Sequence, residues 1–127
     1  MRLLLDTHAF IWWDGDPVKL SPGVRTLCQD PANTLTLSLT SVWEMQIKIR
    51  LGKLRLRLPL KDTISTQQAN WIRLLSITLP HIFALERMPH HHGDPFDRML
   101  IAQANTEGMA FVSRDPFFSS YSVNVVR

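Results

Sequence analysis

The sequence has little that could stabilise a fold covalently or anchor it in a membrane. Only one cysteine, Cys28, occurs in 127 residues, so no disulfide can form within the chain, which fits a reducing compartment. No stretch approaches the roughly 20 apolar residues of a membrane span, and Asp6 and His8 interrupt the apolar run at the N-terminus, so we expect no signal peptide. We therefore expect a cytoplasmic protein, with Cys28 as a small apolar residue on a helix.

Internal repeats, linkers and low-complexity tracts are also absent from the sequence. We therefore predict a single domain over residues 1–127, long enough to bury about two-thirds of its unfolded surface. A composition of 45% hydrophobic and 20% charged residues is typical of a globular protein. The formal net charge of +3 permits nucleic-acid binding without requiring it.

The chain is organised around a short apolar run, residues 3–5, that stops at the carboxylate of Asp6 and precedes a helical pattern. Such a run predicts a buried strand with helices on both faces of its sheet. Further strands are expected at residues 34–39, 73–77, 109–113 and 122–126, and helices at 7–13, 40–51, 61–70, 80–87 and 95–106, with another helix starting after Ser21. This alternation predicts an α/β fold, a three-layer α/β/α sandwich around a mostly parallel sheet.

Four acids stand at predicted strand ends or helix starts: Asp6, Glu44, Asp97 and Asp115. Each has a local explanation. Asp6 and Asp115 could be N-caps, and Ser41 with Glu44 matches a capping box. Asp97 falls in a first helical turn, where the helix dipole favours negative charge.

Taken together, the four acids favour a different interpretation. Because the helix starts of a parallel sheet meet at one edge, these acids should crowd one area, and like charges so close raise one another's pKa values. A bound divalent cation would relieve this repulsion, and all-oxygen ligands suit Mg²⁺ or Mn²⁺ rather than zinc. Such ions activate water and clamp the oxygens of a phosphodiester, so the pattern predicts metal-dependent phosphoryl hydrolysis.

The surroundings of these acids resemble a known family. The segments are LLLDTH at residues 3–8, SVWE at 41–44, KIRLGKL at 48–54, DPFDRMLIAQA at 94–104 and VSRD at 112–115. In order and spacing they resemble PIN-domain ribonucleases, most of all the VapC-like toxins of type II toxin–antitoxin systems. The similarity covers nearly the whole chain.

This resemblance implies an endoribonuclease with a five-stranded sheet, a homodimer, and a cognate antitoxin that blocks the site. It places the Mg²⁺ or Mn²⁺ ligands, and hence the catalytic residues, at Asp6, Glu44 and Asp97, with Asp115 as the fourth. All four are intact, so we expect an active enzyme. Two positions depart from the family pattern: Gly93 stands where relatives often have a basic residue, and Ser113 replaces a usual Thr.

Basic residues that could hold RNA occur in two groups. Residues 53–58 alternate cations with leucines up to Pro59, which predicts an extended arm or edge segment that either grips phosphates or is merely a guarded, solvated edge. Two more cations precede this segment and make it the densest basic stretch of the chain, which contains Lys48, Arg50, Lys53, Arg55 and Arg57. Arg98 and Arg114 follow or precede a predicted metal ligand, so each could hold a substrate phosphate or a neighbouring carboxylate.

Other patterns are less informative. The tract His90–His92 predicts a polar loop near the site rather than zinc, because adjacent loop residues rarely converge on one ion. The four tryptophans are typical core residues, although one or two could belong to a dimer or antitoxin interface.

Two rival functions remain. A haloacid-dehalogenase-like phosphatase would need a second Asp where His8 stands. A non-catalytic RNA-binding or antitoxin-sequestering module would not need the four acids intact.

Overall fold

A computed structural model describes residues 1–89 and 93–127, so the predicted polar loop at 90–92 lies outside the described residues. The strands are β1 (Arg2–Leu5), β2 (Thr34–Ser38), β3 (Arg73–Leu75), β4 (Ala110–Val112) and β5 (Val125–Val126). The helices are α1 (Thr7–Gly15), α2 (Pro22–Gln29), α3 (Leu39–Arg50), α4 (Leu60–Ala69), α5 (Leu79–Arg87) and α6 (Pro95–Glu107), with short 3₁₀ turns at Pro17–Lys19 and Pro116–Ser120. None of the helices in these ranges is long and apolar enough to cross a bilayer.

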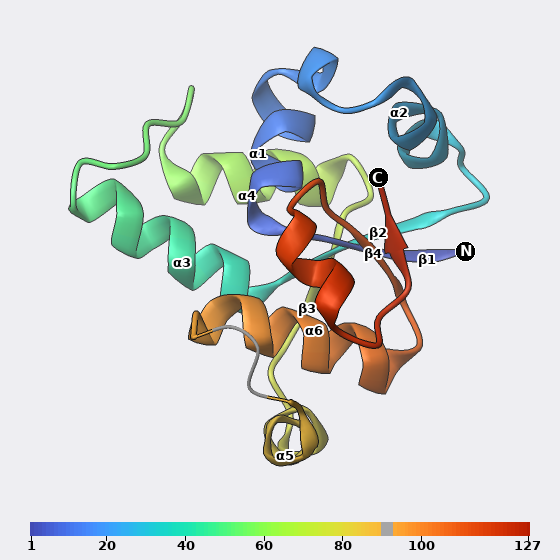
Figure 1. Cartoon of the computed structure of the whole chain (residues 1–127). Helices are drawn as coiled ribbons and strands as arrows, with labels where there is room; N and C mark the ends of the chain where they lie inside the picture. The colour runs from blue at the N-terminus through green and yellow to red at the C-terminus, as the bar shows by residue number, and fades with distance from the viewer. Residues whose placement is uncertain (90–92) are drawn as a thin grey trace.

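The five strands form one sheet in the order β3-β2-β1-β4-β5, and every neighbouring pair is parallel (Figure 1). The predicted α/β fold with a five-stranded sheet is therefore confirmed. β1 is the central strand and pairs with both β2 and β4, so Asp6 follows the middle of the sheet. The predicted final edge strand is present as β5, although it is shorter than expected.

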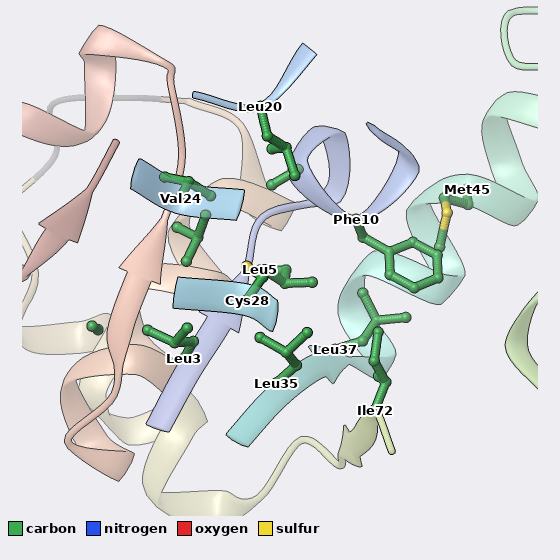
Figure 2. Packing of buried hydrophobic residues seen from close by; sticks show 13 residues of the cluster. Leu3, Leu5, Phe10, Leu20, Val24, Cys28, Leu35, Leu37, Met45 and Ile72 are labelled. Carbon is green, nitrogen blue, oxygen red and sulfur yellow. The ribbon is translucent and has the colours of Figure 1, made fainter. Parts of the chain in front are cut away.

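Alternation along β1 divides the core into two clusters, one on each face of the sheet. Leu3 and Leu5 point into the larger cluster, which α1, α2 and α3 cover (Figure 2). Leu4 points to the opposite face and packs with Leu100 and Phe111 beneath α6. Since α5 packs in turn on α6 (Figure 1), helices cover both faces of the sheet, as the buried apolar run predicted.

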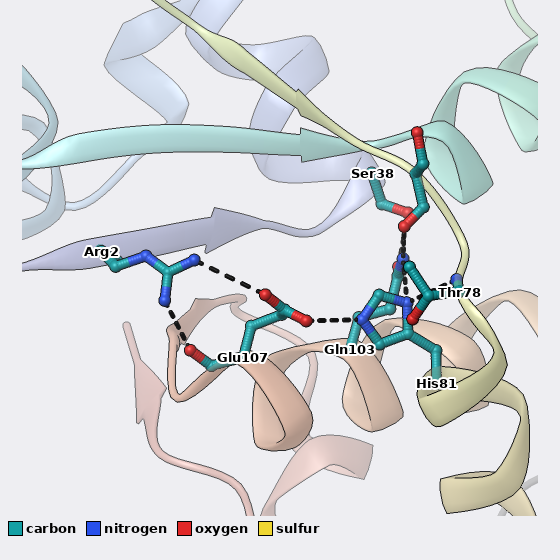
Figure 3. A network of polar contacts seen from close by, with 7 residues as sticks. Arg2, Ser38, Thr78, His81, Gln103 and Glu107 are labelled. Carbon is teal, nitrogen blue, oxygen red and sulfur yellow. Dashed lines mark hydrogen bonds and ion pairs between the residues drawn. The ribbon is translucent and has the colours of Figure 1, made fainter.

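A polar network lies on the second face of the sheet and connects the start of α3 to α6 (Figure 3). Ser38, the N-cap of α3, donates to Gln103 Oε1 of α6 at 2.5 Å. Gln103 contacts the fully buried His81, whose Nε2 lies 2.9 Å from Glu107 Oε2. Arg2 donates to the backbone carbonyl of Glu107 and so ties β1 to the same helix. The network therefore holds α3 and β1 against α6.

The alternative explanation of Ser41 and Glu44 as a capping box does not hold. Ser38 is the N-cap, with its hydroxyl accepting from Thr40 N at 3.0 Å, so α3 begins before Ser41. Ser41 and Glu44 therefore lie within the helix, where both are buried and their side chains make tertiary contacts.

The predicted arm at residues 53–58 is not a strand, and the sheet edges are β3 and β5. Leu54 packs against the larger core cluster, while Arg57 reaches the end of α1. There its Nη2 donates to Asp14 O at 3.1 Å and lies 3.5 Å from Asp14 Oδ1. Leu54 therefore anchors the segment, whereas Leu58 is 39% exposed, and at least one of the cations is committed to the fold.

Candidate active site

A pocket of about 570 Å³ opens where β1 and β4 end and where α1 and α6 begin. All four acids singled out from the sequence line it, together with one more: Asp6, Glu44, Asp97, Asp115 and Asp94. These residues come from four segments far apart in the chain, and the parallel sheet brings them together. The four acids predicted to meet at one sheet edge therefore line one pocket there.

Asp6 serves both as a helix cap and as a pocket residue. Its Oδ1 accepts from Ala9 N at 2.6 Å, and its Oδ2 accepts from the Ser113 hydroxyl at 2.5 Å. Burial raises the pKa of Asp6 above its ordinary value, and the bonds from Ser113 and Ala9 offset only part of this effect. The carboxylate is thus poorly hydrated, and a bound cation would stabilise its negative charge in place of water.

Ser113 links two of the acids. Its hydroxyl donates to Asp6 and accepts from the backbone N–H of Asp115 at 3.1 Å, which sets the direction of the chain after β4. A threonine would carry the same hydroxyl, so the departure from the family pattern at Ser113 preserves these bonds.

Glu44 projects from the second turn of α3, with its side chain only 7% exposed. Its Oε1 accepts from the Thr7 hydroxyl at 2.7 Å, and the Thr7 and Ser41 hydroxyls lie 3.0 Å apart. Its Oε2 lies 2.6 Å from Lys48 Nζ, one helical turn further on. Both carboxylate oxygens are therefore engaged by groups of the protein.

Asp94 and Asp97 reach the pocket from the start of α6. Asp94 is the N-cap, with Oδ1 accepting from Phe96 N at 2.8 Å and from Asp97 N at 3.2 Å, and Pro95 follows at the first helical position. The predicted start of this helix is confirmed. The cap places Asp97 in the first turn of α6, where it is half-buried at the pocket wall.

Few of the basic residues predicted to hold substrate reach this pocket. Arg114 does: it lines the pocket, donates to Lys19 O at 2.8 Å, and stands 5.7 Å from the centroid of the Trp12 ring. Arg98 instead donates to Pro89 O at 3.0 Å and so ties α6 to the chain after α5. The remaining candidates are exposed and lie outside the pocket lining: Arg50, Lys53, Arg55 and Arg57.

Sequence reasoning missed several contributors to the pocket. Asp94 and Thr7 were not among the predicted site residues, although Thr7 directly follows Asp6. Lys48 was grouped with the basic stretch, yet its spacing of four residues from Glu44 on a predicted helix already indicated that the two side chains could pair.

The chemistry of the pocket fits a hard divalent cation, because carboxylate oxygens are the ligands that Mg²⁺ and Mn²⁺ prefer. Across residues 1–89 and 93–127, no three acidic, histidine or cysteine side chains are yet grouped closely enough to hold one ion. Glu44 Oε2, for example, is held by Lys48.

Comparison with known proteins agrees with this architecture. Residues 3–124 match the model of the PIN domain family. The chain belongs to the PIN domain family. The prediction made from the five sequence segments is thus confirmed.

Individual relatives extend this comparison. Ribonuclease VapC22 of Mycobacterium tuberculosis is 27% identical over 114 residues, which is 89% of this chain and 86% of that protein. The crystal structure of VapBC2 from Rickettsia felis, bound to a promoter DNA fragment, superposes with a TM-score of 0.72 at 12% identity, covering 99% of this chain and 98% of that one. FitAcB from Neisseria gonorrhoeae gives a TM-score of 0.67 at 19% identity, with 98% and 96% covered. At these identities, the two structures show a shared PIN fold.

Proposed function

We propose that this PIN domain is a metal-dependent endoribonuclease, the toxin of a type II toxin–antitoxin pair, and that residues 1–127 act as one nuclease domain. The observation that carries the proposal is the convergence of Asp6, Glu44, Asp97 and Asp115 on one pocket from four separate segments. The similarity to Ribonuclease VapC22 over most of both chains supports RNA as the substrate.

In this proposal the four acids would hold Mg²⁺ or Mn²⁺, and the bound ion would supply an activated water and charge neutralisation at the phosphodiester. The protein's own groups orient those acids. Ser113 fixes Asp6, Thr7 fixes Glu44, and the Asp94 cap sets the first turn that carries Asp97. Arg114, held by Lys19 O, is the pocket cation suited to a substrate phosphate.

Two protein partners belong to the proposal: a cognate antitoxin and a second copy of the chain. The solved relatives include complexes named VapBC2 and FitAcB, and this supports an antitoxin partner. Apolar side chains on α5 supply a surface for dimerisation, since Leu79, Ile82 and Phe83 are 64%, 44% and 51% exposed. Large apolar residues exposed together commonly mark an interaction surface.

The test is cleavage of RNA by purified protein with Mn²⁺, comparing the wild type with Asp97→Asn. We expect cleavage to be abolished, because the substitution removes one negative ligand while it keeps the shape of the side chain. Asp62→Asn is the matched control: Asp62 also lies in the first turn of a helix, is exposed, and is outside the pocket lining. Near wild-type cleavage by Asp97→Asn would mean that Asp97 is only a helix-start residue, and it would favour a different catalytic site.

A further inference from the structure

Lys48 brings a positive charge into the acidic pocket from the same helix face as Glu44. Its Nζ lies 2.6 Å from Glu44 Oε2, and it lines the pocket with the acids. Exposed ion pairs at this helical spacing contribute little. This pair differs, because the Glu44 side chain is 7% exposed and has little access to water. The carboxylate therefore depends on its protein partners for charge compensation.

The two partners of Glu44 are not equivalent. Thr7 holds Oε1 by a neutral, buried hydroxyl that is itself paired with Ser41. Lys48 holds Oε2 by a full charge on a long stem, and its side chain is 38% exposed. The ammonium can thus leave Oε2 and be hydrated, whereas the Thr7 hydroxyl is fixed on the first turn of α1.

We propose that Lys48 is the resident counter-cation of Glu44 and competes with the divalent metal for Oε2. The inference rests on the proposed metal-dependent function of the same site. A divalent ion and an ammonium repel each other, so each weakens the binding of the other to one carboxylate oxygen. Metal binding at Oε2 therefore competes with the Lys48 ion pair, and this competition raises the metal concentration at which the site fills. Lys48 is a positioning residue, because it acts through Glu44.

Metal affinity distinguishes a Lys48 that competes with the metal from a Lys48 that only stabilises α3. A purely structural pair would change the melting temperature and leave metal affinity unchanged. A competitor, once removed, leaves Glu44 more available, so the metal binds more tightly. The substitution Lys48→Gln removes the charge and keeps a polar side chain of similar reach.

The matched control is Lys61→Gln, which makes the same change of charge at an exposed residue in the first turn of α4, outside the pocket lining. Two quantities are measured for each protein: the dissociation constant for Mn²⁺, from melting temperature against Mn²⁺ concentration, and the Mn²⁺ concentration that gives half-maximal RNA cleavage. We expect Lys48→Gln to lower both by the same factor, about threefold, the size typical of one partly exposed charge pair. Lys61→Gln should change neither.

Each other result overturns the inference in its own way. Weaker Mn²⁺ binding by Lys48→Gln would mean that Lys48 orients Glu44 for the metal. An unchanged dissociation constant with reduced cleavage would make Lys48 a substrate contact. Equal tightening in Lys61→Gln would show an effect of net charge alone. If the wild type neither bound Mn²⁺ nor cleaved RNA, the proposed function itself would fail, and this is distinguishable from failure at Lys48.

Discussion

Ser113 offers a quantitative test of how the pocket is held together. Its buried hydroxyl donates to Asp6 Oδ2 at 2.5 Å and accepts from Asp115 N at 3.1 Å, so Ser113→Ala deletes both bonds and leaves little cavity. A hydrogen bond to a charged group contributes about 1.5–3 kcal/mol to stability. For a chain of this size each kcal/mol shifts the melting temperature by roughly 3–5 °C. We therefore expect Ser113→Ala to lower the melting temperature by about 5–15 °C at pH 7 in EDTA.

The pH dependence of this effect has a definite sign. Burial raises the folded-state pKa of Asp6, so the stability linked to its protonation is present below its ordinary pKa and is lost as pH rises through the folded-state value. The bond from Ser113 lowers that pKa, so Ser113→Ala should raise it further. The stability gap between variant and wild type should consequently open as pH rises from about 4 to 7.

The assay is thermal melting in EDTA across this pH range, since a bound metal would mask the charge on Asp6. Ser113→Thr is the control, because it retains the hydroxyl and should stay near wild type. A gap that is constant with pH, or that widens toward low pH, would refute the assignment of the Ser113 bond to the ionised carboxylate.

Two further predictions concern residues outside the acids. Burial raises the pKa of the Cys28 thiol to about 11, so its thiolate is scarce at pH 8. A disulfide reagent should therefore react with the native protein only as it opens, and urea should accelerate the reaction sharply; rapid labelling without urea would contradict the packing of α2. Arg114→Gln should weaken RNA binding and reduce its salt dependence by about one phosphate contact. Arg98→Gln should instead lower the melting temperature with RNA affinity unchanged, because Arg98 ties α6 to the chain after α5. Binding titrations at several salt concentrations, together with melting curves, would distinguish the roles of the two arginines. The reverse pattern would disprove the assignment of Arg114 to RNA and of Arg98 to the fold.

Strong local signals let the sequence predict the sheet and the helix starts. The run Leu3–Leu5 is apolar on both faces because it is the central strand of a parallel sheet. Asp94-Pro95 and Gly108 mark the bounds of α6, where Gly108 has a positive φ of 68° as the C-terminal cap. Because such strands and helix starts converge at one edge, the sequence also predicted that the four acids would share a pocket.

Elsewhere, tertiary contacts overrode what the local sequence patterns indicated. The capping box at Ser41 was locally reasonable, but Ser38 reaches both Thr40 N and Gln103 and so starts the helix earlier. The leucines and cations at 53–58 alternate like a strand, yet no neighbouring strand pairs with them. The sequence left open which of the four tryptophans lie in the core, and Trp71 is 88% exposed with a positive φ of 74°. No periodicity in a sequence specifies which side-chain contact prevails at such positions.

The measurement that most directly tests the central claim is the melting temperature of the protein in EDTA and in saturating Mn²⁺. If the acids form a metal site, an ion that binds only the folded state stabilises it by about 2.7 kcal/mol at a hundredfold excess over its dissociation constant. We predict a clear rise in the wild type and loss of that rise in an Asp6→Ala, Asp97→Ala double variant. A rise of equal size in the double variant would place the ion elsewhere and contradict the assignment of this pocket as the metal centre.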